Sequence, residues 1–355
     1  MVKCPVCGHE ADIVCNECGY NVENEYLYNH TVIKLSQSEI DNHNKQINIH
    51  KAIYRKSVES TVLESNDLCD MGYYYFNQVN DVHKAFDYYS KAARLNNPVA
   101  YSWMGYFYDY GQGVSQDYSI ARDYYNRAIE QNEPSAMKLL ADMYREGRGV
   151  VIDLKKSLNY YQRASRLNNN DASVWIGYFY ENGMGVDIDY IKAREYYELA
   201  IEQGNARAAY LLGYMYYSGR GVNKDINKAK DLFLISANRE DESSYEVLGY
   251  LYFNEDNYEE SFKYYHKAAD VGNVVALAWL GYYYENGQGV QQDLKKAKEY
   301  YDKAIEKGNA RAMILLGDMY LAGRYVGKDK TKARSLYQRA KELNDEYAQG
   351  RLDNL

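Results

Sequence analysis

The stretch Trp175–Val186, WIGYFYENGMGV, decides the fold of this chain, because close versions of it recur along most of the sequence. WMGYFYDYGQGV stands at 103–114, LLGYMYYSGRGV at 211–222 and WLGYYYENGQGV at 279–290. A small residue in the middle of the stretch, the marker of each repeat, recurs at steps of 32 to 36 residues. A period of this length predicts a solenoid of stacked helical units. The eight markers are Gly72, Gly105, Ala141, Gly177, Gly213, Gly249, Gly281 and Gly317.

Each repeat predicts two helices joined by a glycine turn. Residues 100–110 carry apolar side chains at helical spacing, a Gly-Gln-Gly-Val turn follows from Gly111, and a second helical pattern covers 118–131. Glycine suits a helix C-terminus because it adopts the left-handed conformation without a Cβ clash. Asp117 offers an acceptor to the free N–H groups of the second helix. Because most repeats keep these glycines and this aspartate, each repeat is predicted to be a helix hairpin.

These residues resemble the Sel1-like repeat, a relative of the tetratricopeptide repeat with a longer Gly-x-Gly-Val turn. The resemblance covers residues 64–355. It implies an all-α fold, an α/α right-handed superhelical solenoid of about eight hairpins, whose first helices line a concave surface. It also implies a role as an adaptor or scaffold. A secreted branch of the family carries a cysteine pair in each repeat, and these repeats have none.

The composition bounds the partners and the compartment. The chain of 355 residues has a net charge of −8, an isoelectric point near 5.4 and a mean hydropathy of −0.66. Nucleic acid and anionic membranes are both negatively charged and bind best to a basic protein surface. The acidic composition of the chain therefore favours protein or peptide partners and argues against nucleic acid and membrane. The sequence shows neither a secretory leader nor an apolar stretch of about 18 residues. With Cys69 the one cysteine of the repeats, a cytoplasmic protein is expected.

The position directly after the marker is predicted to face the concave groove. It points inward in the related tetratricopeptide repeat, and here it holds tyrosine or aspartate, so packing does not fix its identity. Tyrosine is enriched in interface hot spots, where one truncation costs about 2 kcal/mol or more. The alternative is a tyrosine-rich groove that only water covers. The predicted partner-binding residues are Tyr106, Asp142, Tyr178, Tyr214, Tyr250, Tyr282 and Asp318, and Tyr73 holds the same position in the first repeat.

Other rows of the first helix divide between surface and core. The position four residues after the marker lies on the groove face by helical spacing and varies freely, so Asp109, Arg145 and Glu285 are expected to belong to the recognition surface. Tyrosine stands three residues after every marker, and an aromatic residue such as Tyr125 recurs in the second helix. A side chain that every hairpin demands is expected to be part of the packing.

Four cysteines near the start of the chain predict a zinc ribbon. They form two Cys-x2-Cys pairs, each followed by glycine, at Cys4, Cys7, Cys15 and Cys18. Four thiolates complete the tetrahedral sphere of a structural zinc ion. So short a segment buries too little apolar surface to fold alone, whereas zinc supplies roughly 10 to 16 kcal/mol in such peptides. Two disulfides or a rubredoxin-like iron site are the alternatives.

The predicted domains are a zinc ribbon at 1–22, a linker and capping helix at 23–63, and the repeat solenoid at 64–355. No nucleophile elbow, zinc-protease or phosphate-loop motif is found, so we predict a protein that is not an enzyme. The predicted function is an adaptor that binds a protein or peptide in the tyrosine-lined groove, with structural zinc as cofactor and the ribbon as a second contact. The alternatives are a nucleic-acid-associated regulator that uses the ribbon, and a hydrolase that acts in the groove.

Overall fold

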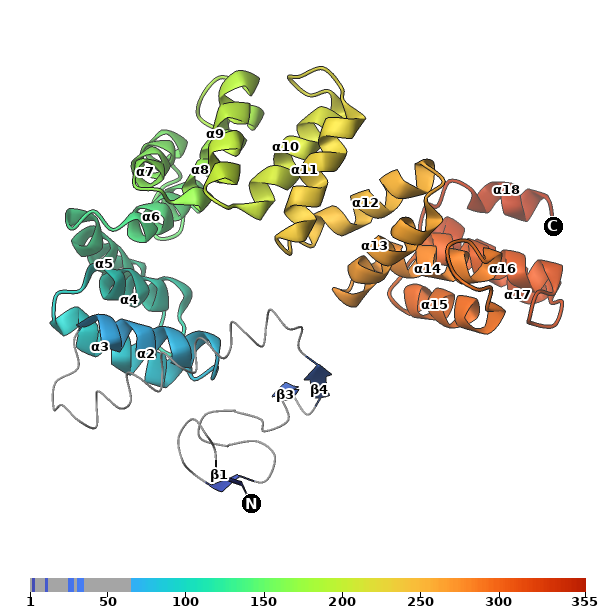
Figure 1. Cartoon of the computed structure of the whole chain (residues 1–355), viewed down its shortest axis with the longest axis horizontal. Coiled ribbons are helices and arrows are strands. Elements are labelled where there is room, and N and C mark those ends of the chain that lie inside the picture. The colour runs from blue at the N-terminus through green and yellow to red at the C-terminus, as the bar shows by residue number, and fades with distance from the viewer. Residues whose placement is uncertain (1, 4–9, 12–24, 29–30, 35–64) are drawn as a thin grey trace. The chain divides into compact units, whose positions relative to one another are not determined.

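The computed structural model describes residues 65–355 with their side chains and, before them, the backbone of residues 2–3, 10–11, 25–28 and 31–34 (Figure 1). The chain divides into two compact units, Met1–Asp187 and Ile188–Leu355. From Ser65 onward every regular element is a helix. No helix in this described part is both long and apolar enough to cross a membrane.

Short helices of nearly uniform length fill both units. Those of the first unit are α2 (Ser65–Asn77), α3 (Val82–Arg94), α4 (Pro98–Tyr110), α5 (Tyr118–Glu130), α6 (Pro134–Glu146), α7 (Leu154–Arg166) and α8 (Asn170–Asn182). Those of the second unit are α9 (Tyr190–Glu202), α10 (Ala206–Ser218), α11 (Ile226–Asn238), α12 (Ser243–Asn254), α13 (Tyr258–Asp270), α14 (Val274–Asn286), α15 (Leu294–Glu306), α16 (Ala310–Ala322), α17 (Lys330–Glu342) and α18 (Ala348–Asp353).

Consecutive helices pack as hairpins, which confirms the prediction of two helices in each repeat. In the first unit α2 packs on α3, α4 on α5 and α6 on α7. In the second unit α10 packs on α11, α12 on α13, α14 on α15 and α16 on α17 (Figure 1). First helices of neighbouring repeats also contact one another: α4 contacts α6, α10 contacts α12, and α14 contacts α16. Within each unit, the first helices therefore lie side by side.

Side-chain caps and left-handed glycines set the helix ends as the sequence predicts. Asp117 accepts hydrogen bonds from two backbone N–H groups in the first turn of α5. Gly111 ends α4 with a φ of 65°. The shortened turns of the first and sixth repeats keep their caps, because Asp81 and Asn257 each accept from the third residue of the next helix.

Asparagine caps the first helices, a feature that our prediction does not include. The asparagine eight residues before the marker accepts, through its side-chain oxygen, the N–H of the third helical residue. This cap is present at Asn169, Asn205, Asn273 and Asn309.

The marker glycine allows the two helices of a hairpin to approach each other over a buried tyrosine ring. A Cβ atom added to Gly105 would lie 2.4 Å from Tyr125 Cε1, and one added to Gly281 would lie 2.4 Å from Tyr301 Cε1. The second-helix aromatics are thus core residues, as predicted. Tyr89, Tyr125, Tyr161, Tyr197, Phe233, Tyr265, Tyr301 and Tyr337 are all fully or almost fully buried.

The tyrosine three residues after the marker packs on the outer side of the same second helix. Tyr108 stacks on Tyr124 with ring centroids 5.9 Å apart, and Tyr284 stacks on Tyr300 at 5.6 Å. Lys296 lies over the Tyr284 ring at 5.1 Å. The packing role is as predicted, although these rings are partly exposed.

Two small antiparallel pairs of strands precede the helices. β1 (Val2–Lys3) pairs with β2 (Glu10–Ala11), and β3 (Glu25–Tyr28) pairs with β4 (Thr31–Lys34). The second pair lies within the segment at 23–63 that is predicted to be a linker and capping helix, and the prediction does not include strands there. The four cysteines, and residues 35–63 of the predicted linker and capping helix, lie outside the described residues.

Replacing a marker glycine with a larger residue is expected to destabilise the chain, because the tyrosine ring already occupies the space. For Gly281→Val we expect the free energy of unfolding to fall by about 1 to 3 kcal/mol, as for other overpacked cores. Urea unfolding followed by circular dichroism measures this change. Gly327→Val is the control, since no atom lies within 4 Å of a Cβ at Gly327. Equal stability of the two variants would contradict the role of the glycine.

Candidate functional site

The predicted groove tyrosines lie at the same place on successive first helices. Tyr106 is on α4 and Tyr178 on α8 in the first unit, and Tyr214, Tyr250 and Tyr282 are on α10, α12 and α14 in the second. We call Tyr106 and Tyr178 the tyrosine face of the first unit, and Tyr214, Tyr250 and Tyr282 the tyrosine face of the second unit. Tyr178 is 38% exposed, and Tyr214 and Tyr250 are each 43% exposed. Large aromatic rings with this exposure remain available to a partner.

Neighbouring aromatic rings hold the members of the tyrosine face in place. The Tyr282 ring lies edge-on to Trp279 at 5.7 Å and to Phe253 of the preceding repeat at 6.2 Å. The Tyr178 ring lies edge-on to Trp175 at 5.6 Å. A ring that is already held loses little conformational freedom when a partner binds, which favours affinity.

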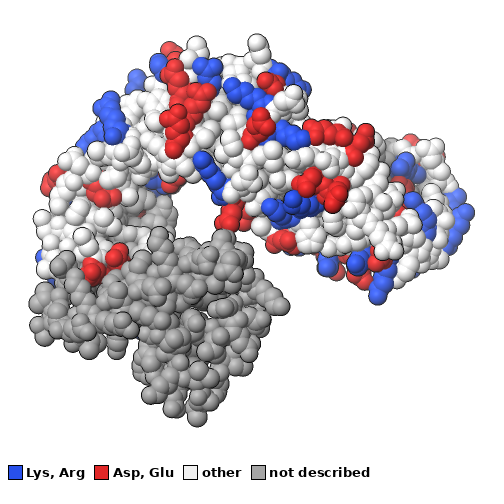
Figure 2. Space-filling view, in the orientation of Figure 1, with Lys and Arg blue, Asp and Glu red and all other residues white. Residues whose placement is uncertain are grey.

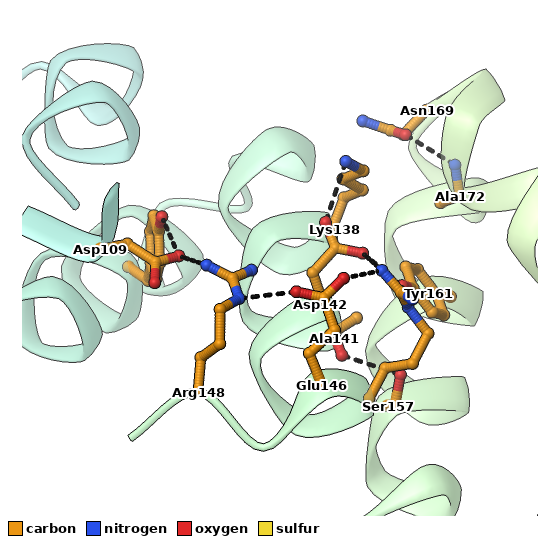
Figure 3. A network of polar contacts seen from close by, with 12 residues as sticks. Asp109, Lys138, Ala141, Asp142, Glu146, Arg148, Ser157, Tyr161, Asn169 and Ala172 are labelled. Carbon is orange, nitrogen blue, oxygen red and sulfur yellow. Dashed lines mark hydrogen bonds and ion pairs between the residues drawn. The ribbon is translucent and has the colours of Figure 1, made fainter. Parts of the chain in front are cut away.

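Asp142 does not lie on the exposed face, contrary to our prediction. It is 3% exposed and is held by Lys138, Arg145 and Tyr161 (Figure 3). Lys138 Nζ lies 2.9 Å from Asp142 Oδ2, Arg145 donates to Oδ1 at 3.2 Å, and the Tyr161 hydroxyl also donates to Oδ1. The carboxylate is therefore occupied inside the protein and holds the two cations on α6.

Asp318 is likewise engaged within the chain. The Tyr337 hydroxyl donates to Oδ1 at 2.6 Å, and Arg351 of α18 lies 3.0 Å from Oδ2. Its side chain remains 22% exposed. Of the two aspartates predicted to bind a partner, only Asp318 keeps exposed surface.

The carboxylates four residues after the marker are buried, so their assignment to the recognition surface is wrong. Asp109 is 0% exposed and Glu285 is 4% exposed. Each accepts a hydrogen bond from the core tyrosine of its own hairpin: Tyr125 to Asp109 at 3.2 Å and Tyr301 to Glu285 at 2.7 Å. The buried carboxylates thus belong to the packing of the hairpin.

An arginine from the glycine turn of the next repeat neutralises each of these two carboxylates. Arg148 pairs with Asp109 (Figure 3), and Arg324 lies 2.8 Å from Glu285. Burial raises the pKa of both carboxyl groups above their usual range, and the nearby guanidinium opposes that rise. We call this arrangement the arginine junction between repeats.

Other pairs of repeats use an aromatic junction. Trp103 stacks on Tyr89 of the preceding hairpin with ring centroids 5.0 Å apart, and Trp279 stacks on Tyr265 at 5.1 Å. Trp175 stacks on Tyr161 in the same way, and the Arg145 guanidinium lies over its ring at 3.9 Å. The sequence could have indicated these aromatic junctions, because all three tryptophans stand two residues before a marker.

The described residues include one cysteine, Cys69, which is buried. Burial raises the pKa of the Cys69 thiol to about 12, so this lone cysteine is protonated at neutral pH and is a poor nucleophile. Between residues 65 and 355, no three or more His, Cys, Asp or Glu side chains gather in a way that could hold a metal ion.

Comparison with known protein families decides the class of the repeats. The Sel1 repeat matches eight consecutive segments, which together cover most of the chain: 67–97, 98–133, 134–169, 171–205, 206–241, 244–273, 274–309 and 310–345. The chain belongs to the Sel1 repeat family. Its fold class is accordingly an all-α repeat solenoid of Sel1 hairpins, and Sel1 repeat proteins generally act as scaffolds for protein interactions.

Two solved structures resemble this Sel1 repeat chain over most of its length. A protective antigen present in uropathogenic Escherichia coli strains is 32% identical, with a TM-score of 0.71 over 85% of this chain and 66% of the antigen. The chain thus spans slightly less than two thirds of that protein. A Sel1 repeat protein from Oxalobacter formigenes is 26% identical, with a TM-score of 0.56 over 82% of this chain and 86% of its own. No curated protein matches the chain.

The burial of Asp109 predicts a specific pH dependence of stability. Since its pKa is raised in the folded chain, the folded state keeps this proton to higher pH than the unfolded state. The stability that this bound proton contributes is fully present below the ordinary carboxyl pKa of about 3.9. It is lost as the pH rises through the raised pKa of Asp109 in the folded chain. We therefore expect the unfolding free energy of the wild type, relative to Asp109→Asn, to fall as the pH rises above the ordinary pKa of the carboxyl group.

Urea unfolding at a series of pH values measures this difference. Asp87→Asn, which removes an exposed carboxylate on α3, is the control. If the wild type instead gained stability relative to Asp109→Asn as pH rises, the arginine junction would outweigh burial and our interpretation would be wrong.

Proposed function

We propose that this Sel1 repeat chain is a non-enzymatic adaptor that binds a protein or peptide partner along the tyrosine face. The observation that carries the proposal is the exposure of Tyr178, Tyr214 and Tyr250 at one position of successive first helices. The hairpins do not need a tyrosine there, because the same position in the third and eighth repeats holds Asp142 and Asp318. Rings that packing does not require, and that stay exposed, are suited to recognition.

The surface charge supports a protein partner over nucleic acid. On the face shown in Figure 2, basic and acidic side chains of the described residues are interspersed. Single-strand binders combine aromatic rings with a continuous basic groove, and duplex binders also need a basic surface. The net charge of −8 works against both.

Truncating the tyrosine face is expected to abolish partner binding. For Tyr178→Ala, Tyr214→Ala and Tyr250→Ala combined, we expect affinity-purified partners to be lost, since each hot-spot tyrosine contributes roughly tenfold or more to affinity. Quantitative mass spectrometry of the purified material measures the loss.

The matched control replaces three exposed apolar side chains of the turns with alanine, namely Val151, Ile188 and Tyr325. Circular dichroism confirms folding of both triple variants. If the partners of the tyrosine triple variant matched those of the wild type, the proposed function would be wrong.

We also propose that residues 1–22 form a structural zinc ribbon that offers a second contact. The donor set fits this metal, because Cys4, Cys7, Cys15 and Cys18 supply four thiolates, the number that closes a structural zinc site. The pairing of β1 with β2 supports the module, because these strands flank the first cysteine pair in sequence. Bound zinc would supply the folding energy of the segment.

Metal analysis of the full chain tests the ribbon. We expect close to one zinc ion per chain, and none after Cys4→Ser and Cys7→Ser are combined, because two thiolates cannot hold a structural zinc ion. Inductively coupled plasma mass spectrometry measures the content. The control is Cys69→Ala, which removes a cysteine of the repeats and should keep the zinc. Full zinc content in the double serine variant would rule out these ligands.

A further inference from the structure

One pocket lies on the tyrosine face of the second unit, where α12, α14 and α16 come together. Its volume is about 510 Å³, within the range of ligand-binding pockets. Phe253, Trp279, Tyr282 and Leu315 supply apolar walls. We call this cavity the α14 pocket. Two hydrogen-bond donors, Asn309 and Arg311, stand at the start of α16 beside these walls.

Comparison with the preceding repeat explains why this pocket is open. There, Asn273 caps α14 and donates its amide nitrogen to Glu246 Oε2 at 2.7 Å. One repeat later, Asn309 takes the place of Asn273, since both stand eight residues before a marker. Ala278 takes the place of Glu246, since both stand three residues before a marker. Where the preceding repeat supplies a carboxylate, this repeat supplies a methyl group.

Asn309 is left with an unused donor as a result. Its side-chain oxygen caps α16 by accepting the Ala312 N–H at 2.8 Å. Among residues 65–355, its amide nitrogen donates no hydrogen bond. The place that Glu246 fills for Asn273 is therefore vacant beside Asn309, and it adjoins an apolar cavity.

Arg311 adds a positive charge at the same end of the pocket. Its guanidinium stacks on the Tyr347 ring at 3.9 Å, which holds it in place. Its nearest carboxylates, Asp345 and Glu346, are at 3.9 and 4.0 Å, too far for hydrogen bonds. Since the side chain remains 43% exposed, it can bind a further carboxylate.

The surrounding repeats have the charge that suits an acidic ligand. Residues 274–355 contain 14 Lys and Arg but 11 Asp and Glu, a net charge of +3, whereas the whole chain carries −8. Charge complementarity of this kind steers and orients a partner.

We propose that the α14 pocket binds an acidic segment of a protein partner, with a large apolar side chain between Trp279 and Leu315. A neighbouring Glu or Asp of that segment takes the place of the missing carboxylate and is bound by Asn309 and Arg311. This inference rests on the proposed function, because it assigns a ligand chemistry to one part of the tyrosine face.

Binding of short synthetic peptides to the full chain tests the proposal. The peptides carry one central Trp, Leu or Ala, flanked by Glu, Gln or Lys, and fluorescence anisotropy of a labelled copy measures the dissociation constants. We expect Trp or Leu with Glu to bind best, and replacement of Glu by Lys to weaken binding about tenfold or more. Equal binding of the Glu and Lys series, or of the Trp and Ala peptides, would overturn the proposal.

Two variants locate the binding. Arg311→Glu should remove the preference for Glu-flanked peptides, and Ala278→Glu should block binding by offering Asn309 the carboxylate that Asn273 already has. The matched control is Arg207→Glu, which changes the equivalent residue of α10, where Arg207 is bonded to Ser243 instead. If Arg311→Glu and Arg207→Glu bound the Glu-flanked peptides equally well, the pocket would not be the site.

The partner assay separates this inference from the proposed function. Loss of partners in the tyrosine triple variant together with full retention in folded Arg311→Glu would overturn the α14 pocket alone. Retention in both variants would overturn the tyrosine face as well. Loss in both, with retention in Arg207→Glu, is the result that the proposal expects.

Discussion

Most hairpins of this chain depend on the contact between a marker glycine on the first helix and an aromatic ring, usually tyrosine, on the second. In the seventh repeat the Tyr301 ring fills the space that a Cβ on Gly281 would occupy. The same ring then reaches through the hairpin, and its hydroxyl donates to Glu285 at 2.7 Å. A single side chain therefore closes the hairpin and also satisfies a buried carboxylate that faces the next repeat. This links the packing inside a repeat to the packing between repeats.

Between repeats, the described part of the chain uses two solutions to the same packing problem. An aromatic junction stacks a tryptophan such as Trp279 on the preceding core tyrosine, Tyr265. An arginine junction neutralises a buried carboxylate with a turn arginine, as Arg324 does for Glu285. The position four residues after the marker, which varies freely in sequence, is therefore used by the arginine junctions.

The contrast between contacts inside a repeat and contacts between repeats explains which parts of the structure the sequence could predict. The repeat period, the glycine helix ends and the aspartate caps depend on backbone geometry, which each repeat requires separately, so a single sequence reveals them. Asp109 and Asp142 were assigned to the surface because their positions vary. At Asp109 that variation arises because the carboxylate is matched to Arg148 on the next repeat, whereas Asp142 is matched to side chains of its own repeat. Reading one position at a time detects neither kind of pair.

Two further features were not predictable for related reasons. The α14 pocket depends on a small residue, Ala278, in place of a carboxylate, and its meaning becomes clear only from the contact between Asn273 and Glu246. The β3–β4 pair had a usable signal, since residues 25–28 and 31–34 are rich in β-branched and aromatic side chains and only two residues separate them. The α14 pocket could be recognised only from the three-dimensional contacts, whereas the β3–β4 pair could have been predicted from the residue types of a short segment.

In the function that we propose, a partner lies on the first helices and leaves the second helices free. Hydrogen–deuterium exchange of the full chain, with and without the partner recovered by affinity purification, tests this claim directly. The account predicts slower exchange on binding in α8, α10, α12 and α14, with α11, α13 and α15 unchanged. Protection confined to the second helices, or to the turns that join the hairpins, would contradict it.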